Sequence, residues 1–337
     1  MLKFVGDVCF TDNHFDIGFG VGSSIKKGFN PFHRIARDKN DCWIGNFECV
    51  ASSKTIHSDY RKECFRIEPS NLSHCQLFDY LGIANNHVME HGAEAYKDME
   101  ERLKSICKDT FGAKTQKSVT FDHQGKRVSV TGFSLRREEN KDIPEYWSIP
   151  EVSEIIEEQK SLSSDYKVAY IHWGVEFVNY PSIDQVRFAH MLIDAGYDLI
   201  IGMHPHVLQG FEVYKGKYIF YSLGNFVFNM AYLPTKYSIV VSVDLDKNEV
   251  AYDYIRIGND YAPSIVDSQE VPNECKLECI NTSVGLIQNP EEYAEVAKKR
   301  LKRYRKAHHK AFIKNLYRYD MGIMISMVVD FIKRKFN

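Results

Sequence analysis

The sequence lacks the features of a disulfide-stapled secreted protein and those of a membrane-spanning one. Its eight cysteines contain no Cys-x-x-Cys pair, and several lie inside apolar runs, which favours reduced, buried thiols in a reducing compartment. No run of eighteen apolar residues occurs, and the nearest, residues 321–332, contains Asp330, so we expect no transmembrane helix. The net charge is only −2, so the chain as a whole is no polyanion binder and no nucleic-acid partner is expected.

Internal repeats and low-complexity segments are also missing, as are the parts of a secretory leader at the start of the sequence. Residues 1–7 enter a strand-like run with no basic region, apolar segment or cleavage site before it. We therefore expect a cytoplasmic protein, at most peripheral at the inner face of a membrane. With 337 residues, of which 44% are hydrophobic, the chain can bury a large core without disulfides or structural metals.

Short apolar runs alternate with longer amphipathic stretches, and this pattern predicts a layered α/β fold. Two late runs, 239–245 and 250–257, are separated by a short polar turn and predict an antiparallel hairpin. The other strands are expected at residues 2–5, 42–45, 80–84, 128–133, 168–171, 199–201 and 218–222. Helices are expected at residues 93–107, 150–162 and 184–195.

The C-terminal segment differs in charge from the rest of the chain. Residues 291–337 contain thirteen Lys/Arg and five Asp/Glu, a net charge of +8 that leaves −10 on the preceding residues. A basic helix is expected over 298–310, before the apolar stretch 321–332. We predict a main domain over 1–260, a linker or wrapping segment over 261–290, and a basic helical extension over 291–337. The extension either packs on the main domain, or rests on an anionic membrane surface or polymer.

Six clusters of polar residues follow predicted strands. The carboxyl ends of the strands in an α/β sheet form one edge, where ligands bind. Asp, Glu, Asn and His side chains at that edge are suitable ligands for two closely spaced metal ions. One histidine at a strand end is usually only hydrogen-bonded, but six successive clusters are hard to explain in that way. The clusters are Gly6-Asp7, Asn46-Phe47-Glu48, Asn85-Asn86-His87, His172-Trp173-Gly174-Val175-Glu176, His204-Pro205-His206 and Leu223-Gly224-Asn225-Phe226.

The segment His204-Pro205-His206 is the most informative of these clusters. Proline disfavours the helical region for the residue before it, so we expect an extended backbone at His204. In an extended chain residues i and i+2 project to the same side, which would turn both imidazoles toward one metal cluster. The alternative is a turn with two solvated histidines, which the preceding buried strand makes less favourable.

In their order along the chain, these motifs resemble those of the CapA family, the poly-γ-glutamate capsule biosynthesis proteins. That family is a branch of the calcineurin-like metallophosphoesterases, and the resemblance extends from about residue 2 to residue 230. It implies a four-layered α/β/β/α sandwich with a dinuclear metal centre, here followed by a C-terminal helical extension. The motifs are specific for the fold and the site, and much less specific for the substrate.

The resemblance also implies roles for individual residues. Glu48 would bridge two divalent ions, and His87 would contact the leaving group as a general acid. Glu176 is a further candidate for the catalytic set. The chemistry of these ligands suits Mn²⁺, Fe or Zn²⁺ better than Mg²⁺. The implied metal ligands are Asp7, Glu48, Asn86, His172, His204 and His206.

The sequence departs from the superfamily pattern at the first motif, which is Asp-x-His elsewhere and ends in Cys9 here. Alternation along the strand favours a buried thiol at this position, although a soft metal ligand is the other interpretation. The first metal site would then lose an imidazole, and Asn225, Glu176, a water or His14 would complete it. The usual aspartate three residues after the active histidine is Glu90, a conservative change.

Four residues are candidates for binding the substrate. Arg61, Arg66 and Arg136 have forked guanidinium groups that suit phosphate or carboxylate, and Asn225 is the fourth. The function predicted first is a metal-dependent hydrolase of phosphoesters in capsule or surface-polymer biosynthesis. The alternative is a catalytically weak accessory subunit that handles poly-γ-glutamate or another polyanion beside a membrane-associated capsule synthase. Hydrolysis of an amide or γ-glutamyl bond by the same centre is a third interpretation.

Overall fold

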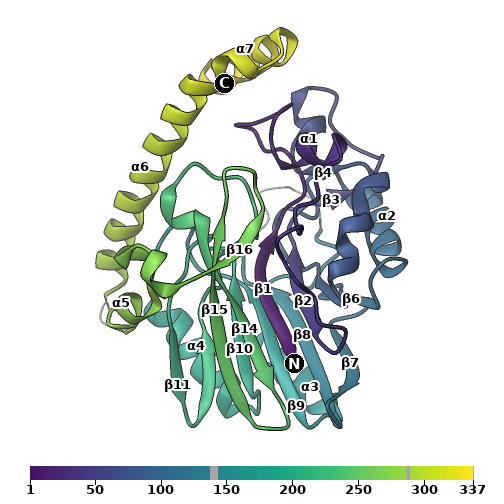
Figure 1. Ribbon diagram of the computed structural model, residues 1–337, viewed down its shortest axis with the longest axis vertical. Helices are drawn as coiled ribbons and strands as arrows, with labels where there is room; N and C mark the ends of the chain where they lie inside the picture. The colour runs from purple at the N-terminus through teal and green to yellow at the C-terminus, as the bar shows by residue number, and fades with distance from the viewer. Residues whose placement is uncertain (137–142, 286–288, 337) are drawn as a thin grey trace.

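The computed structural model describes residues 1–136, 143–285 and 289–336, and two β-sheets lie face to face at its centre (Figure 1). The first sheet has the order β16 (Pro263–Val266), β15 (Glu249–Ile257), β14 (Tyr237–Asp244), β1 (Leu2–Val8), β2 (Cys42–Phe47), β5 (Tyr80–Gly82), β6 (Asp109–Phe111). The strand β13 (Asn225–Val227) also pairs with β1, in parallel. The second sheet has the order β11 (Phe211–Tyr214), β12 (Lys217–Phe220), β10 (Leu199–Met203), β9 (Tyr166–His172), β8 (Lys126–Ser134), β7 (Ser118–His123).

Helices cover the outer face of each sheet. On the first sheet lies α2 (Ala93–Lys104), whose Met99 and Leu103 share a buried core with Leu81 of β5. The second sheet is covered by α3 (Val152–Ser161) and α4 (Ile183–Asp194), which bury Ile155 and Leu192.

Between the two sheets lies a separate apolar core, in which Phe4 and Ile44 of the first sheet meet Val130 and Tyr170 of the second. The layers therefore follow in the order α/β/β/α, and the predicted sandwich with a C-terminal helical extension is confirmed. Smaller elements complete the fold: α1 (Val21–Lys26), β3 (Val50–Ala51), β4 (Arg66–Ile67), α5 (Leu277–Asn281), and the 3-10 turns η1 (Tyr60–Glu63), η2 (Pro69–Leu77), η3 (Leu233–Lys236), η4 (Ser268–Glu270), η5 (Asn273–Cys275) and η6 (Leu316–Arg318).

The predicted strands and helices are confirmed to within a few residues, including the antiparallel hairpin of β14 and β15. The strands that the sequence pattern missed are short or lie at sheet edges. The strand β7 reads Ser-Val-Thr-Phe-Asp-His, and β6 and β13 have three residues each. Such segments have too few apolar residues to show a period of two, so their pairing depends on neighbouring strands.

Two long helices form the C-terminal extension, and they follow one edge of the molecule (Figure 1). The first, α6 (Pro290–Asn315), begins with an Asn289 cap and a proline in its first turn and is twice as long as predicted. Its Leu301, Tyr304 and Ala307 pack against the core beside the first sheet. The second helix is α7 (Met321–Phe336). Among its described residues, Ile323 is the apolar side chain that packs against this core.

One contact of α6 gives a pH-dependent prediction. His308 is buried between Phe15 and Tyr304, and its Nε2 accepts a hydrogen bond of 3.2 Å from the Ala231 N–H. Burial, reinforced by the charges of Lys236 and His309, lowers the pKa of His308 to about 4.

The unfolded chain takes up this proton near the ordinary value of 6.5, whereas the folded chain does so only near pH 4. Acidification between these values therefore favours unfolding, by about 3 kcal/mol in total from this single group. Urea unfolding at pH 7 and pH 4.5 should show a smaller pH dependence for His308→Gln than for the parent protein. His33→Gln, at an exposed histidine that is not among the causes of this pKa shift, should keep the parental dependence, and equal slopes for all three proteins would contradict the assignment.

Candidate metal centre

The carboxyl ends of strands from both sheets meet at one place in the molecule. Asp7 in β1 lies in register with Asn46 in β2 and with Asn225 in β13. In the second sheet, His172 ends β9 and pairs with Met203, the last residue of β10. The segments that follow β2, β5 and β10 therefore place their polar side chains at the same edge.

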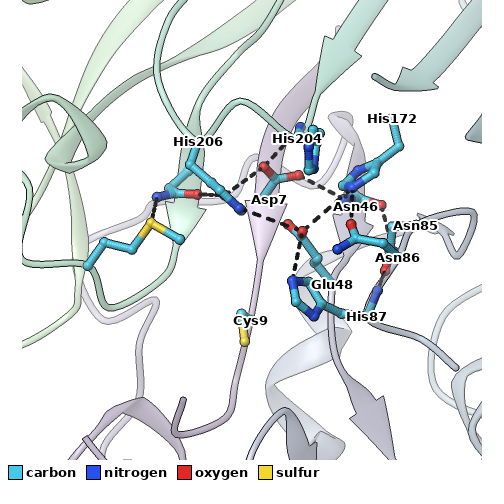
Figure 2. A network of polar contacts seen from close by, with 12 residues as sticks. Asp7, Cys9, Asn46, Glu48, Asn85, Asn86, His87, His172, His204 and His206 are labelled. Carbon is cyan, nitrogen blue, oxygen red and sulfur yellow. Dashed lines mark hydrogen bonds and ion pairs between the residues drawn. The ribbon is translucent and has the colours of Figure 1, made fainter. Parts of the chain in front are cut away.

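Figure 2 shows the polar side chains that converge at this edge. Within the described residues, three groups have ligand atoms that all lie within 4.8 Å of one another. Glu48 is common to two of them and His204 to two, so the groups are adjacent. They are Glu48, His172 and His204; Asp7, Glu48 and His206; and Glu176, His204 and His206.

The polar atoms at the centre of these groups fit a cation. Both carboxylate oxygens of Glu48 and both ring nitrogens of His204 are buried and have no hydrogen-bond partner among the described residues. Leaving such groups unpaired in a protein interior costs free energy, and a carboxylate costs most. A divalent ion bound between them would satisfy both residues, so the donor set fits the metal that the motifs predict.

Burial also sets the protonation of the site. It raises the pKa of Glu48 well above its usual value, with the Asp7 charge as the next cause. Burial lowers the pKa of His172 to about 3 and that of His204 well below the ordinary value. Both imidazoles are therefore neutral near pH 7, the form in which a ring nitrogen can bind a metal.

His206 is oriented by groups behind it. Its Nδ1 lies 2.9 Å from Asn225 Oδ1 and 3.3 Å from Asp7 Oδ2, while its Nε2 faces Glu48 Oε1 at 3.9 Å. Burial alone would lower the pKa of His206, but its hydrogen bond to Asp7 raises the pKa overall. Burial alone would raise the pKa of Asp7, and the interactions with His206 and His172 lower it. Asn225 is fully buried behind the imidazole, outside the set of residues that line the cavity described below.

Asn86 and His172 lie on the other side of Glu48. The Asn86 Oδ1 is 2.7 Å from His172 Nε2, which is 3.6 Å from Glu48 Oε1. Behind them, Asn85 donates to Asn46, and Asn46 donates to Asp7 at 2.8 Å. This chain of amides, which the sequence motifs include without assigning a role, fixes the carboxylate of Asp7 in place.

The backbone of the His204-Pro205-His206 segment is not extended, and that prediction is wrong. The φ angles are +93° at His204 and +59° at His206, a region that residues other than glycine rarely adopt. The strand β10 ends at Met203, and the chain then turns sharply, stabilised by a bond from the His204 N–H to Asp7 Oδ2 of 3.2 Å. Both rings still face the cluster, with centroids 5.9 Å apart, but through local strain.

Cys9 points away from the ligand cluster (Figure 2). Its Sγ lies 3.0 Å from Thr11 Oγ1, and among the described residues it belongs to none of the three groups. Burial raises the pKa of the thiol well above its usual value, with the neighbouring Cys49 as the next cause. Glu176 is the residue that the structure brings within ligand distance of His204 and His206.

His87 lies at the mouth of the centre. Its ring stacks on Phe65 with centroids 3.9 Å apart, its Nδ1 contacts Glu90, and its Nε2 is 3.8 Å from Glu48 Oε1. The side chain also lines a cavity of about 390 Å³ that opens next to the cluster. His87 therefore faces the cavity and the ligand set at once, and Glu90 fixes its orientation.

The cavity contains some of the predicted substrate-binding residues. Arg136 lines it, and the Arg136 Nε is buried with no partner among the described residues. Arg61 lines it as well, although Asp59 holds its guanidinium with bonds of 2.6–3.0 Å. Arg66 does not reach the cavity, because its guanidinium bonds to Glu68 and to the carbonyls of Ser52 and Lys62.

Tyr304 of α6, a helix of the predicted C-terminal extension, also lines the cavity. Its ring stacks on Phe177 with centroids 3.6 Å apart, and Phe177 follows Glu176 and stacks at 6.2 Å on His206. The basic helix expected over 298–310 includes Tyr304, but its sequence pattern does not assign this residue to a cavity. Its position in the cavity wall depends on how α6 docks.

If the chain has the phosphoester hydrolysis that the sequence predicts, we expect Tyr304→Ala to lower its rate roughly tenfold, because Phe177 would lose its support and Glu176 and His206 would shift. The unfolding free energy should fall by about 3 kcal/mol for the lost ring. Tyr304→Phe should restore both quantities. Tyr317→Ala removes an exposed tyrosine of η6, in the same extension, and is the matched control, since it should leave both unchanged.

The chain is thus a two-sheet α/β sandwich with a buried cluster of Asp, Glu and His at its strand ends. These features place it in the class of α/β proteins with a candidate metal centre. The family described as bacterial capsule synthesis protein PGA_cap matches residues 1–230, and the chain belongs to this family. The CapA resemblance of the sequence motifs is thereby confirmed.

Individual relatives agree with this assignment. The capsule biosynthesis protein CapA of Bacillus anthracis is 37% identical over 189 residues, which are 52% of this chain and 46% of that protein. The PGA biosynthesis protein CapA of Bacillus subtilis is 31% identical over 269 residues, 73% of this chain and 68% of the relative. A probable polyglutamine synthesis accessory protein of Mycobacterium tuberculosis is 24% identical over 56% of this chain and 55% of its own. The match with the B. anthracis relative therefore covers less than half of the length of that protein.

Solved structures with similar folds include a phosphatase from Mycoplasma pneumoniae and a putative 5'-nucleotidase from Staphylococcus aureus. The first has a TM-score of 0.45 at 14% identity and covers 80% of this chain and 94% of its own. The second has a TM-score of 0.44 at 14% identity and covers 83% of this chain and 57% of its own.

Proposed function

We propose that this protein is a metal-dependent hydrolase of phosphoesters that acts in the production of a bacterial capsule or surface polymer. The observation that carries the proposal concerns Glu48 and His204, which are buried beside a cavity lined by His87. Their side-chain polar atoms have no hydrogen-bond partner among the described residues. Divalent ions bound at such a centre would supply Lewis-acid chemistry and lower the pKa of a water. Mn²⁺, Fe or Zn²⁺ suits the mixed oxygen and nitrogen ligands better than Mg²⁺.

The ligand set divides into two halves that share Glu48. His172, His204 and Asn86 lie on one side of this carboxylate, and Asp7 and His206 lie on the other. Glu176 stands within ligand distance of His204 and His206 and replaces the imidazole that Cys9 does not supply. A carboxylate shared by two half-sites is the arrangement expected of a bridging ligand.

The residues of the cavity supply the acid and the anion site. His87 donates a proton to the leaving oxygen, and its contact with Glu90 keeps the ring turned toward the substrate. Arg136 has an unpartnered buried Nε, so its guanidinium is available to bind a phosphoryl or carboxylate oxygen. Arg61 is held by Asp59 and contributes positive charge at the cavity rim.

The second candidate function is that of a weakly catalytic accessory subunit that handles poly-γ-glutamate or another anionic polymer beside a membrane-associated capsule synthase. The observation in its favour is Cys9, which turns away from the ligands where the superfamily has a histidine. The relative from M. tuberculosis is described as a probable synthesis accessory protein, and this also favours it.

The test is to remove metals with a chelator, reload the protein with Mn²⁺, Zn²⁺, Fe²⁺ or Mg²⁺, and assay each form. Phosphomonoesters, phosphodiesters and γ-glutamyl amides are the substrates. Hydrolysis of a phosphoester by the Mn²⁺, Zn²⁺ or Fe²⁺ form, lost in Arg136→Ala and His87→Ala, is the expected result. Metal binding without turnover of any substrate would favour the accessory subunit, and turnover of the amide alone would favour the third interpretation.

A further inference from the structure

The helix α7 has two opposite faces, and one of them is apolar and exposed. Successive residues of an α-helix are 100° apart, so residues 321, 325, 328, 329 and 332 lie within about 100° of one another around the axis. Each of these residues is a Met, Ile or Val. Their exposed fractions are 67% for Met321, 59% for Ile325, 56% for Val328, 44% for Val329 and 48% for Ile332. We call these five residues the apolar stripe.

The other face of α7 holds the helix on the protein. Ile323 packs against the core beside the first sheet, and Tyr60 of η1 donates a hydrogen bond of 3.1 Å to Asp330. Residues 323 and 330 lie on the side of the helix opposite the apolar stripe. The carboxylate of Asp330 is therefore turned to the protein, and the apolar stripe is turned outward. The stripe is thus a surface feature of α7, and a different face of the helix packs on the core.

Positive charge surrounds the apolar stripe in the chain. The helix continues after Ile332 into Lys333-Arg334-Lys335, and α6 leads into it with a row of basic side chains. One groove on α6 is lined by Lys298, Leu301, Lys302, Arg305, Lys306, His309, Lys310 and Ile313. Among the lysines and arginines of this groove, Lys298 alone lies within 4.0 Å of a carboxylate in the described part of the chain, and that carboxylate belongs to Glu295.

We propose that α6 and α7 form a docking surface for an anionic lipid bilayer, in which the apolar stripe enters the headgroup region and the basic residues contact lipid phosphates. Amphipathic helices that lie in a membrane interface combine such an apolar face with flanking Lys and Arg. Within the described residues, no helix has the length and hydropathy needed to cross a bilayer.

Charge favours a bilayer over a second copy of the chain. Residues 291–337 carry a net charge of +8, so two copies that paired through their apolar stripes would bring two strongly positive segments together. An anionic surface neutralises the same charge and buries the same stripe. This inference is independent of the chemistry of the metal centre.

The experiment is co-sedimentation of the 337-residue chain with vesicles. We expect binding to vesicles of phosphatidylcholine with a quarter of phosphatidylglycerol, at least tenfold weaker binding to phosphatidylcholine alone, and at least tenfold weaker binding in 0.5 M than in 0.1 M NaCl. The double variant I325D/V328D should bind at least tenfold more weakly while its metal content stays unchanged. V213D is the matched control, because Val213 is exposed to 53% on the edge strand β11, and it should bind like the parent.

A second variant tests the charged half of the surface without touching α7. K302E/K306E reverses two exposed cations of α6, and it should weaken binding at 0.1 M NaCl and reduce its salt dependence. Parental binding by I325D/V328D would overturn the proposal, as would equal binding to neutral and anionic vesicles. A parent protein that is a dimer without vesicle affinity, and that I325D/V328D converts to a monomer, would assign the apolar stripe to a second copy instead.

Discussion

His204→Ala is expected to lose metal and activity together. The side chain is buried, both of its ring nitrogens lack partners, and it belongs to two of the three candidate ligand groups. Removal of a direct ligand should lower metal affinity by at least ~100-fold, the upper end of what loss of an outer-shell partner costs. Elemental analysis after dialysis, with turnover measured on the same samples, checks this expectation.

The control for this variant is His190→Ala. His190 pairs with Glu212 at 2.8 Å and stacks on Tyr214, outside the three candidate groups. It should keep its metal and its turnover. If His204→Ala retained full metal content, the convergence of these histidines would have another purpose and the metal centre would be wrong.

His87→Ala is expected to separate catalysis from metal binding. The ring lines the cavity and contacts Glu90, and its Nε2 is 3.8 Å from Glu48 Oε1, so it stands next to the ligand set without completing a group there. Loss of a general acid should lower turnover by ~10²–10⁴-fold and leave the metal content nearly intact.

Glu90→Gln gives the graded comparison for His87. It keeps the shape of the side chain that orients the ring but removes its charge, so turnover should fall less than in His87→Ala. Equal loss of metal in His87→Ala and His204→Ala would make His87 a ligand and contradict its assignment as the acid.

Local signals in the sequence predicted a layered α/β fold and the meeting point of the polar clusters, whereas the α/β/β/α order of the layers was implied by the resemblance of the motifs to a known family. A buried strand that ends in a polar residue, such as β9 with His172 or β1 with Asp7, is visible in the order of residues. The role of Asn225 and the position of Tyr304 could not be predicted in this way. Asn225 belongs to one of the six clusters but contacts the ring of His206 from behind. Tyr304 reaches the cavity from α6 and stacks on Phe177, a residue distant in the chain.

Backbone strain was the other feature that local rules missed. Proline restricts the residue before it, and this rule predicted an extended His204. The observed φ of +93° is maintained by tertiary contacts, among them the bond from its N–H to Asp7. The identities of the substrate and of the metals likewise cannot be predicted from the sequence pattern. The arginines are an example, because Arg66 and Arg136 look alike in the sequence until the fold separates them.

The ligands of the candidate centre come from two different sheets, and this has a consequence for the stability of the whole sandwich. Asp7 and Glu48 belong to the first sheet and the segment that follows β2, whereas His172 and His204 belong to the second sheet and the segment that follows β10. An ion held by both sets would fasten the two halves of the molecule to each other, and it would bind the folded chain alone. Free metal at a hundred times its dissociation constant would then raise the unfolding free energy by about 2.7 kcal/mol. The melting temperature would thus report occupancy of the centre without any substrate being known.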